Sequence, residues 1–440
     1  MSEGVDEAAI ILRSSRMKRE VQRLRASASW RIGLHLTNSV RNPLRLLVLP
    51  FSFPIYCIYL ALERLGKVSA PPRKEVLEDQ IEDQIVEVQD IRNCIVLFPT
   101  NGVGFGHFTR LYALAKRLRK LDDSLEIVFF TPMPTLHVPY SDEFPTYHLA
   151  GRYKHKNMEA STWNMLVEEM LTLVFEVHKP KSFIFDGAFP YRGMLNAINQ
   201  RNSLRKIWLR RGMFKKGSSV PVDSISFFDT VIHPKDAVER NDSEMIHSIR
   251  TENVSPITLI DNEEMLERNV VRSRLGLPIG CKVTYVQLGA GKINQIDSDI
   301  RIVVEALLKD PNMYVVIGES MLGKRVDINL DRIRIIRDYP NAIYFKGFDY
   351  SVQAGGYNSF HEMRRLRLPT LFIPNLNTGM DDQLARCLVA KDEGWGEVLK
   401  SVTPETVNNA LLKICDKMPA PITESNGANE LAEMIIEERI

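Results

Sequence analysis

Short apolar runs alternate with segments of helical periodicity along most of the chain after residue 92. The run Cys94–Pro99 (CIVLFP) is continuous and apolar, which is typical of a parallel strand buried on both faces. A glycine-rich loop follows, and then a predicted helix whose apolar positions are Leu111, Leu114, Ala115 and Leu118. Further strands are predicted at Ile127–Thr131, Ser182–Phe185 and Lys206–Leu209. Strands that alternate with helices or long connections indicate a doubly wound α/β domain.

The pattern starts again in the second half of the chain, at Val283–Leu288 (VTYVQL). A second glycine loop follows this predicted strand, and the next segment has the periodicity of an amphipathic helix. Three more strands are predicted, at Tyr314–Ile317, Ala342–Phe345 and Thr370–Ile373. We therefore expect two similar α/β domains, which cover residues 91–254 and 255–440. A final helix around Glu430–Glu438 can pack against either domain.

Residues 1–90 have a different pattern, which predicts a helical extension and a polar linker. Its first part is a basic stretch that contains Arg13, Arg16, Lys18, Arg19, Arg23, Arg25 and Arg31. The next segment, Pro43–Leu62, approaches the ~20 apolar residues that span a bilayer. Pro50 and Pro54 interrupt it, and a proline costs about 3 kcal/mol in a helix interior. Three interpretations remain: a transmembrane helix, a kinked segment in one leaflet, and a soluble hairpin packed on the protein.

Composition and charge limit the class of protein. The chain has 440 residues, of which 44% are hydrophobic and 25% are charged, as in ordinary globular proteins. Its formal net charge of +2 argues against electrostatic binding of nucleic acid. The five cysteines are widely spaced, without a CxxC pair, so we expect neither a disulfide framework nor a zinc site. A reducing cytoplasm fits this usage, and the N-terminus lacks the features of a signal peptide.

The first candidate site is the glycine loop after the first predicted strand. Residues 101–107 are NGVGFGH, and Arg110 follows one turn later. Gly104 and Gly106 let the backbone approach a ligand, and the start of the next helix can bind an anion. The spacing differs from the GxGxxG of dinucleotide sites, and the acidic residue expected about 20 positions later is not at a strand end. A neutral His107 can accept a proton from a hydroxyl group, or it can simply cap the helix.

Asp186 follows the predicted strand Ser182–Phe185 directly. The carboxyl ends of parallel strands form the ligand-binding edge of an α/β domain, so Asp186 is expected at the same edge as His107. Three roles remain open for this carboxylate. It can orient His107, act as a base itself, or cap the turn before Gly187.

The second glycine loop, Gly289-Ala290-Gly291-Lys292, repeats the arrangement of the first in the second half of the chain. Backbone amides in such a loop can hold a pyrophosphate. The sequence is not a Walker A motif, because GxxxxGK[ST] is absent. A tight turn without a ligand is the alternative.

The third segment, residues 355–362, is GGYNSFHE. Gly356 is predicted to end a strand, and Asn358 or Ser359 is predicted to cap a short helix whose N-terminus faces phosphate. Glu362, one turn later, can accept hydrogen bonds from the two hydroxyl groups of a ribose. The next predicted helix starts with two residues that can reach a sugar ring, Asp382 and Gln383. Alone, Glu362 would be an ordinary solvated carboxylate, but the order of the segments favours a binding site.

From about Cys94 to Leu399 the chain resembles the MurG-like family of GT-B glycosyltransferases, which use UDP-sugars. That family combines an N-terminal glycine loop ending in His with a C-terminal signature AG…E…PxxxxP…DQ…A. Here the two motifs are GVGFGH and AGGYNSFHE…LPTLFIPN…DDQLARC. The resemblance implies two Rossmann-like domains that face each other across a cleft. It also implies a single displacement that inverts the anomeric configuration.

The resemblance assigns roles to individual residues. His107 is placed near the reacting centre, the segment from Gly356 to Ser359 around the diphosphate, Glu362 at the ribose and Gln383 at the donor sugar. We expect His107 and Asp186 to be catalytic. The residues expected to bind the donor are Gly104, Gly106, Gly289, Gly291, Gly356, Asn358, Ser359, Glu362, Asp382 and Gln383. Arg386 stands where the family commonly has Asn, and the loop VQLGAG lacks the usual Ser, so the donor sugar stays open.

The sequence therefore predicts an inverting glycosyltransferase that moves a sugar from a nucleotide-sugar, with UDP-sugars favoured by the resemblance. We expect neither a metal ion nor a cofactor, because backbone N–H groups would stabilise the departing diphosphate. Two alternatives remain, a nucleotide-sugar hydrolase and a catalytically inert GT-B partner protein.

The expected use of cytosolic nucleotide-sugars limits how the N-terminal extension can contact a membrane. Basic residues before Pro43–Leu62 favour the cytoplasmic side, so a single span would export both domains away from cytosolic nucleotide-sugars. We therefore favour a segment that lies in or dips into the inner face of the cell membrane, beside anionic lipids. A lipid-linked or surface-glycan acceptor is expected beside it.

Overall fold

The computed structural model of the protein describes residues 27–65, 67–68, 91–100, 104–210, 224–238, 249–289, 296–319, 330–378, 381–415, 417 and 424–440. Most of the basic stretch, the polar linker and Gly291 lie outside the described residues. The chain divides into two compact units, one that contains a helical hairpin and one that contains two sheets.

The first sheet is entirely parallel. Its strands are β1 (Arg92–Pro99), β2 (Glu126–Thr131), β3 (Thr146–His148), β4 (Pro180–Asp186), β5 (Arg205–Leu209), β6 (Thr230–Pro234) and β7 (Arg250–Val254). Their order is β3-β2-β1-β4-β5-β6-β7, with β1 and β4 at the centre. The last six residues of β1 are all buried, because helices or loops cover both faces of such a sheet.

The second sheet is also entirely parallel. Its strands are β8 (Lys282–Gln287), β9 (Met313–Gly318), β10 (Ile333–Ile336), β11 (Tyr350–Gln353), β12 (Thr370–Phe372) and β13 (Gly396–Val398). Their order is β10-β9-β8-β11-β12-β13, so β8 and β11 are central. Both sheets thus have the doubly wound arrangement that the alternating pattern predicts.

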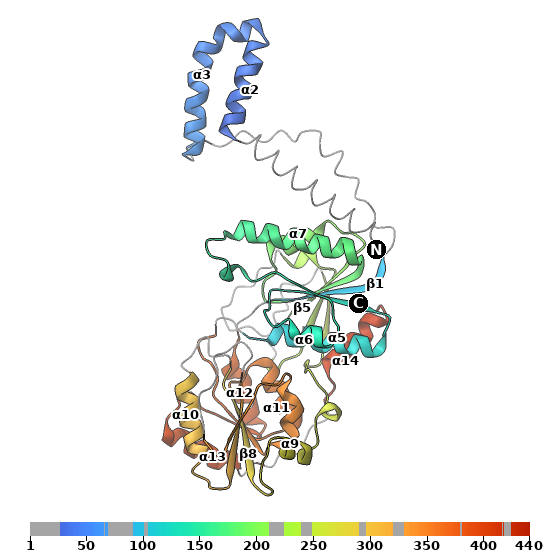
Figure 1. Ribbon diagram of the computed structural model, residues 1–440, viewed down its shortest axis with the longest axis vertical. Helices are drawn as coiled ribbons and strands as arrows, with labels where there is room; N and C mark the ends of the chain where they lie inside the picture. Colours follow the sequence, from blue (N-terminus) through green and yellow to red (C-terminus); the bar gives the residue numbers. More distant parts are fainter. Residues whose placement is uncertain are drawn as a thin grey trace. The chain divides into compact units, whose positions relative to one another are not determined.

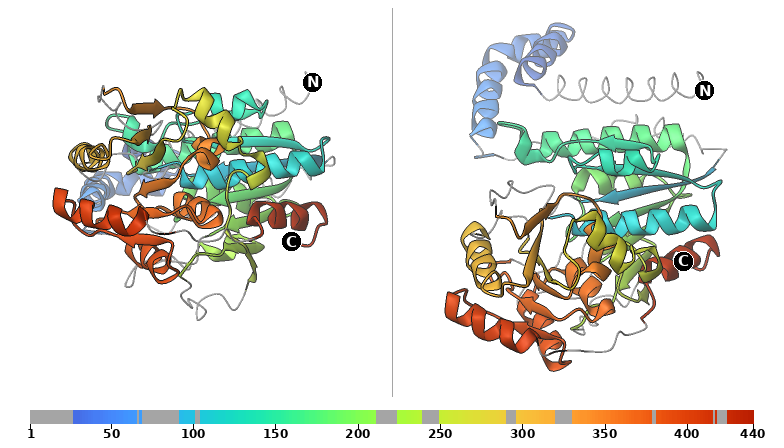
Figure 2. Two further views of the ribbon diagram at one scale, coloured as in Figure 1. Left: turned by 90° about the horizontal axis from the view of Figure 1, so that it is seen from below. Right: turned by 60° about the horizontal axis from the view of Figure 1, so that its bottom comes forward.

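Helices and single helical turns connect these strands. The helices are α5 (Gly106–Leu121), α6 (His137–Ser141), α7 (Ala160–His178), α8 (Arg192–Asn199), α9 (Arg268–Arg274), α10 (Ile296–Leu307), α11 (Tyr357–Leu366), α12 (Gln383–Asp392), α13 (Pro404–Cys415) and α14 (Gly427–Ile436). The 3-10 turns are η1 (Arg152–Lys154), η2 (Ile225–Phe227), η4 (Asn262–Glu264) and η5 (Asn341–Gly347). On one face of the second sheet, α10 and α13 lie side by side, as the views in Figure 2 show.

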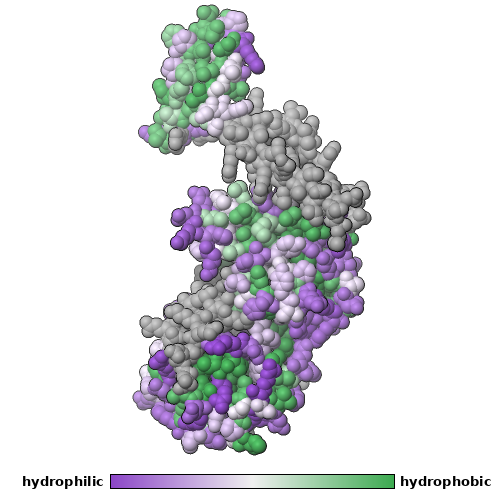
Figure 3. Space-filling model, in the orientation of Figure 1, coloured by the Kyte–Doolittle hydropathy of each residue, from purple (hydrophilic) through white to green (hydrophobic). Residues whose placement is uncertain are grey.

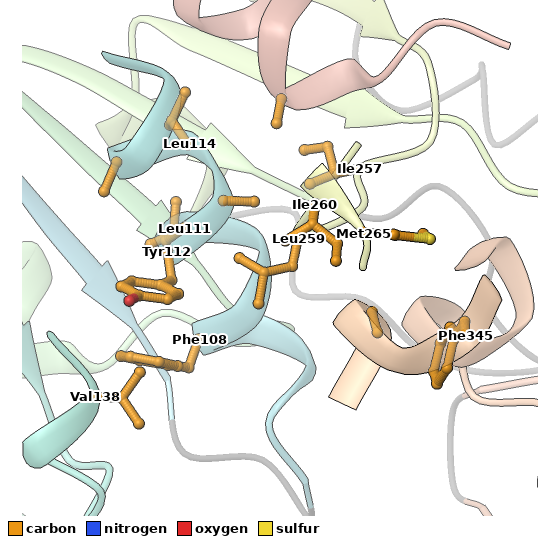
Figure 4. Close-up of a cluster of buried hydrophobic side chains, with 14 of the residues drawn as sticks. Phe108, Leu111, Tyr112, Leu114, Val138, Ile257, Leu259, Ile260, Met265 and Phe345 are labelled. Carbon is orange, nitrogen blue, oxygen red and sulfur yellow. The ribbon is translucent and has the colours of Figure 1, made fainter. Parts of the chain in front are cut away.

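A single apolar core continues from the first sheet into the second. Figure 4 shows Leu111 and Leu114 of α5 beside Ile257 and Leu259, in the segment that connects the two sheets. The C-terminal helix α14 packs against α5 (Figure 1). The helix expected near the C-terminus therefore crosses back to the first sheet.

The N-terminal unit contains a hairpin of α2 (Ala28–Val40) and α3 (Pro43–Arg64), which pack against each other. The helix α3 continues through Pro50 and Pro54. Apolar side chains cover much of the hairpin surface in Figure 3. The exposed apolar residues of the hairpin include Trp30, Leu34, Leu44, Leu47, Val48, Phe51, Ile55 and Ile58.

Two local predictions are wrong. The run Ala342–Phe345 lies in the 3-10 turn η5 and not in a strand, although Ala342, Tyr344 and Phe345 are buried. Its apolar character reflects packing in the core, which a helical turn satisfies as well as a strand does. Gly356 does not end a strand either, because β11 stops at Gln353.

Candidate active site

His107 and Asp186 meet at the carboxyl edge of the first sheet. His107 lies in the first turn of α5, which follows β1, and Asp186 is the last residue of β4. Because β1 and β4 are neighbours in register, Pro99 pairs with Asp186 and the two loops start side by side. His107 Nδ1 lies 2.7 Å from Asp186 Oδ1. The pairing of these two residues was one of the roles left open by the sequence.

Arg110 binds the same carboxylate from the next turn of α5. Its Nε donates to Asp186 Oδ2 at 2.9 Å, and its Nη2 donates to Oδ1 at 2.6 Å. Burial alone would raise the pKa of the Asp186 carboxyl, but the charges of Arg110 and His107 and their hydrogen bonds lower it. Asp186 is therefore an anion held between the Arg110 guanidinium and the His107 ring.

The geometry favours an orienting role for Asp186. Its side chain is 1% exposed, whereas that of His107 is 18% exposed. An acceptor hydroxyl group can therefore reach the imidazole but not the carboxylate. In the tautomer with Nδ1 protonated, Nδ1–H donates to Asp186 and Nε2 is the atom that can take a proton.

The two glycine loops differ in the reason why glycine suits each position. Gly289 has φ +93°, which lies in the left-handed region, so this turn after β8 favours glycine for conformational reasons. Among the described residues, a Cβ at Gly104 would meet no atom within 4 Å, and one at Gly106 would touch only Arg110 Nη1 at 3.9 Å. Within the part of the chain that the structure describes, side chains of other residues therefore leave space beside Gly104 and Gly106.

The third segment starts α11, and Gly356 is the N-cap of this helix. The prediction that Asn358 or Ser359 caps the helix is wrong, since both residues lie inside its first turn. Gly356 offers no side chain to cap the helix, and a Cβ there would meet none of the described atoms within 4 Å. The N–H groups of the first turn and the positive end of the helix dipole are thus suited to bind an anion.

Glu362 lies on α11, one turn after this helix start, and it is half-buried. Burial raises the pKa of the Glu362 carboxyl to about 8, although the charge of Arg365 acts in the opposite direction. Among the described residues Glu362 has no hydrogen-bond partner. Such a carboxyl can accept hydrogen bonds from a polar ligand, as expected for a ribose site.

Tyr339 connects the surroundings of Glu362 to α5. Burial raises the pKa of the Tyr339 hydroxyl, and the nearby Glu362 carboxylate raises it further. The Tyr339 hydroxyl lies 2.8 Å from Thr109 Oγ1, two residues after His107. Glu362 and His107 therefore belong to one region of the molecule. No sequence pattern indicates a role for Tyr339, because its partner lies 230 positions away.

Asp382 and Gln383 make local contacts at the start of α12. Asp382 is the N-cap, and its carboxylate accepts a hydrogen bond from Ala385 N at 3.1 Å. Gln383 Oε1 accepts from Asn375 N at 2.9 Å, which braces the loop after β12. Both residues are half-buried and stand where this loop meets the helix.

Arg110 also contacts the start of α11. Its Cζ lies 5.3 Å from the centre of the Tyr357 ring, and Tyr357 is the first residue of the helix. His107, the buried carboxylate that it contacts and a helix N-terminus suited to an anion thus lie close together. Such an arrangement can remove a proton from one group while it stabilises negative charge on another.

Comparison with solved structures defines the fold class. The glycosyltransferase of kitacinnamycin is 15% identical, with a TM-score of 0.56, over 79% of this chain and 99% of that one. The spinosyn forosaminyltransferase SpnP is 12% identical, with a TM-score of 0.52, over 79% and 94%. MurG of Acinetobacter baumannii is 13% identical, with a TM-score of 0.50, over 78% and 99%.

These likenesses establish the fold. The chain has the GT-B fold of glycosyltransferases, with two Rossmann-like domains, as the sequence motifs predict. No protein-family model matches the sequence, and no curated protein matches it either.

Proposed function

We propose that this protein is an inverting glycosyltransferase that transfers a sugar from a nucleotide-sugar, favoured as a UDP-sugar, to an acceptor at a membrane. One observation carries the proposal. Arg110 binds the Asp186 carboxylate, which contacts His107. The Cζ atom of Arg110 also lies 5.3 Å from the ring centre of Tyr357, the first residue of the helix α11. The candidate base and the candidate anion site are thereby close enough to act on one donor–acceptor pair.

The proposed reaction is a single displacement at the anomeric carbon. His107 Nε2 takes the proton of the acceptor hydroxyl group as its oxygen forms the new glycosidic bond. The bond between the anomeric carbon and the diphosphate oxygen breaks, and the electron pair leaves with the nucleoside diphosphate. Amides of the α11 first turn stabilise that charge, so neither a metal ion nor a cofactor is required by this scheme. Asp186 stabilises the imidazolium that forms.

The hairpin of α2 and α3 supports a membrane-proximal acceptor. Among the described helices, α3 alone has the length and apolar composition to cross a bilayer, and none of its most apolar 18-residue window is buried. Arg31 Nη1 donates to both oxygens of Glu63 at 2.8 and 2.9 Å, so the two ends of the hairpin meet at an ion pair.

The distribution of charge favours a hairpin that lies in one leaflet. Arg41 and Arg45 are exposed at the turn, opposite the Arg31–Glu63 pair. Charged groups at both ends favour contact with headgroups, while the apolar side chains between them enter the acyl region. We therefore propose peripheral attachment to the inner face of the cell membrane and a lipid-linked or surface-glycan acceptor.

A donor screen tests the proposed function. The full chain is incubated with UDP-, TDP- and GDP-sugars, with and without membrane lipid extract, and release of nucleoside diphosphate is followed. We expect release that depends on the extract and is lost in Glu362→Ala and His107→Ala. Release without extract would identify a hydrolase. No release and no thermal shift with any nucleotide would identify an inert GT-B protein and contradict the proposal.

A further inference from the structure

A buried ion pair joins the end of the first sheet to the helix α12. Asp236 lies two residues after β6, and Arg386 lies in the first turn of α12. Arg386 Nε donates to Asp236 Oδ1 at 2.8 Å, and Nη2 donates to Oδ2 at 2.8 Å. This bidentate pairing fixes both the distance and the plane of the two groups.

The remaining donors of Arg386 hold the loop that precedes α11. Nη1 donates to the carbonyl oxygen of Gly355 at 2.9 Å, and Nη2 also donates to Asp381 Oδ1 at 2.7 Å. Gly355 is followed directly by Gly356, the N-cap of α11. Gly355 has φ +81°, and a Cβ there would clash with Cys387 Sγ. The Arg386 guanidinium therefore holds the loop before α11 at Gly355, where the positive φ and the contact with Cys387 restrict substitution.

Burial makes this cluster sensitive to the loss of any member. The side chains of Arg386 and His361 are 0% exposed, and that of Asp236 is 3% exposed. Burial alone would raise the pKa of the Asp236 carboxyl, but the charge and hydrogen bonds of Arg386, with a contribution from His361, lower it. Removal of Asp236 would leave the buried Arg386 guanidinium with Asp381 as its carboxylate partner among the described residues, and such a loss costs far more than the loss of an exposed pair.

Tyr357 connects the same segment to the candidate active site. Its hydroxyl group donates to the carbonyl oxygen of Lys235 at 2.9 Å, beside Asp236. Its ring centre lies 5.8 Å from Arg386 Cζ and 5.3 Å from Arg110 Cζ. The first residue of α11 thus touches both the Asp236–Arg386 pair and the group that binds Asp186.

We propose that Asp236 is a positioning residue that holds the N-terminus of α11 in place through Arg386. This inference rests on the proposed function, in which that N-terminus receives the departing diphosphate. A residue of the first domain thereby sets the geometry of the leaving-group site in the second. Displacement of such a site by about 1 Å can lower the rate 10²-fold, so the pair acts on turnover without touching substrate.

The same contacts explain the departure of Arg386 from the family pattern. Its side chain is fully buried, and Nε, Nη1 and Nη2 all donate to protein oxygens. Arg386 therefore binds Asp236, Gly355 and Asp381, and we expect it to make no direct contact with the donor sugar.

Matched Arg→Lys substitutions test this role. Arg386→Lys keeps the charge but loses the planar fork that reaches Asp236 and Gly355 together. The control is Arg117→Lys, because Arg117 is equally buried and joins α5 to Asp261 and Glu264 of the connecting segment. Asp236→Asn tests the other partner, and Asp236→Glu replaces it if Asp236→Asn does not fold. Thermal stability, kcat, KM and hydrogen–deuterium exchange of the segment 355–360 are measured for each full-length variant.

We expect Arg386→Lys and Asp236→Asn to lower kcat at least 10-fold and to increase exchange in 355–360. Arg117→Lys should lower thermal stability to an extent similar to that of Arg386→Lys. It should change neither kcat nor exchange in 355–360. Equal kcat and equal exchange in Arg386→Lys and Arg117→Lys would overturn the inference.

Failure of the proposed glycosyltransferase function can be distinguished from failure of the positioning role of Asp236. If the wild-type protein neither binds nor cleaves any nucleotide-sugar, that function is wrong, and exchange alone then decides the positioning role. Unchanged exchange in 355–360 after Asp236→Asn would overturn it, whereas increased exchange would support it.

Discussion

Arg110 and His107 approach one carboxylate from two successive turns of α5, with Asp186 Oδ1 2.6 Å from Arg110 Nη2 and 2.7 Å from His107 Nδ1. Asp186 is therefore fixed on both sides and excluded from solvent. An anion in that position holds the imidazole in one orientation and stabilises its protonated form. We therefore propose a division of roles in which Asp186 orients the imidazole and His107 reacts.

Asp186→Asn tests this division. The amide occupies the same volume but no longer stabilises an imidazolium, so we expect kcat to fall by about 10²–10⁴. The dissociation constant for nucleoside diphosphate should stay within about 2-fold, because among the residues described the Asp186 carboxylate forms hydrogen bonds only with Arg110 and His107. Steady-state kinetics and calorimetry measure the two quantities. A parallel loss of affinity and turnover would argue against an orienting role.

Glu362→Gln tests the raised pKa of about 8. A carboxyl whose pKa is higher in the folded state contributes stability below its ordinary pKa, near 4.5, and loses it as the pH rises through 8. Each unit of difference corresponds to about 1.4 kcal/mol, and glutamine has no proton to lose. We therefore expect Glu362→Gln to melt above the wild type at pH 9 and close to it at pH 5.

The control for this prediction is Glu393→Gln, because hydrogen bonds from Arg364 and Trp395 outweigh burial and lower the pKa of Glu393. Its contribution to stability is present above the ordinary pKa, so the variant should be less stable than the wild type at pH 9. Differential scanning fluorimetry at pH 5, 7 and 9 distinguishes the two signs. Equal melting of the wild type and Glu362→Gln at every pH would contradict the raised pKa.

Tyr339→Phe removes the hydrogen bond between Tyr339 and Thr109, which joins the second sheet region to α5. Loss of one such bond costs about 1 kcal/mol in the free energy of unfolding. Tyr314→Phe is the control, because the Tyr314 hydroxyl makes no hydrogen bond with the described residues. Urea denaturation measures both. Identical midpoints for the two variants would show that the Tyr339–Thr109 bond does not stabilise the fold.

The exposed apolar face of the α2–α3 hairpin is expected to bind lipid. Phe51→Asp with Ile55→Asp places two charges on the exposed apolar face of α3, where each is costly in the acyl region. We expect at least a 10-fold loss of binding to vesicles that contain anionic lipid. Leu412→Asp, at an exposed position of α13, should have no effect. Equal vesicle binding by both variants would exclude the hairpin as the anchor.

The central strands were predictable because burial on both faces leaves a continuous apolar run in the sequence. Cys94–Pro99 lies within β1, and Val283–Leu288 overlaps β8. The exposed edge strand β7 and the three-residue strands β3 and β13 carry no such signal. Short elements of this kind are fixed by their neighbours and not by their own composition.

The sequence predicts those residues of the candidate site that stand at or after the end of a central strand. His107 and Asp186 each come just after or at the end of a central parallel strand, so topology alone brings them to one edge. Asp236 and Arg386 are separated by 150 positions, and neither stands in a pattern that indicates the other. Their pairing depends on how the two domains pack, which the sequence periodicity does not specify.

Transfer of the sugar can be followed directly with a labelled donor. A donor identified by the screen is labelled in its sugar, incubated with the wild-type protein and membrane lipid extract, and the label is traced after a single turnover. We predict that the label moves into the lipid or glycan fraction with inverted anomeric configuration, and that His107→Ala abolishes this transfer. Label recovered as free sugar, or transfer that persists in His107→Ala, would contradict the account.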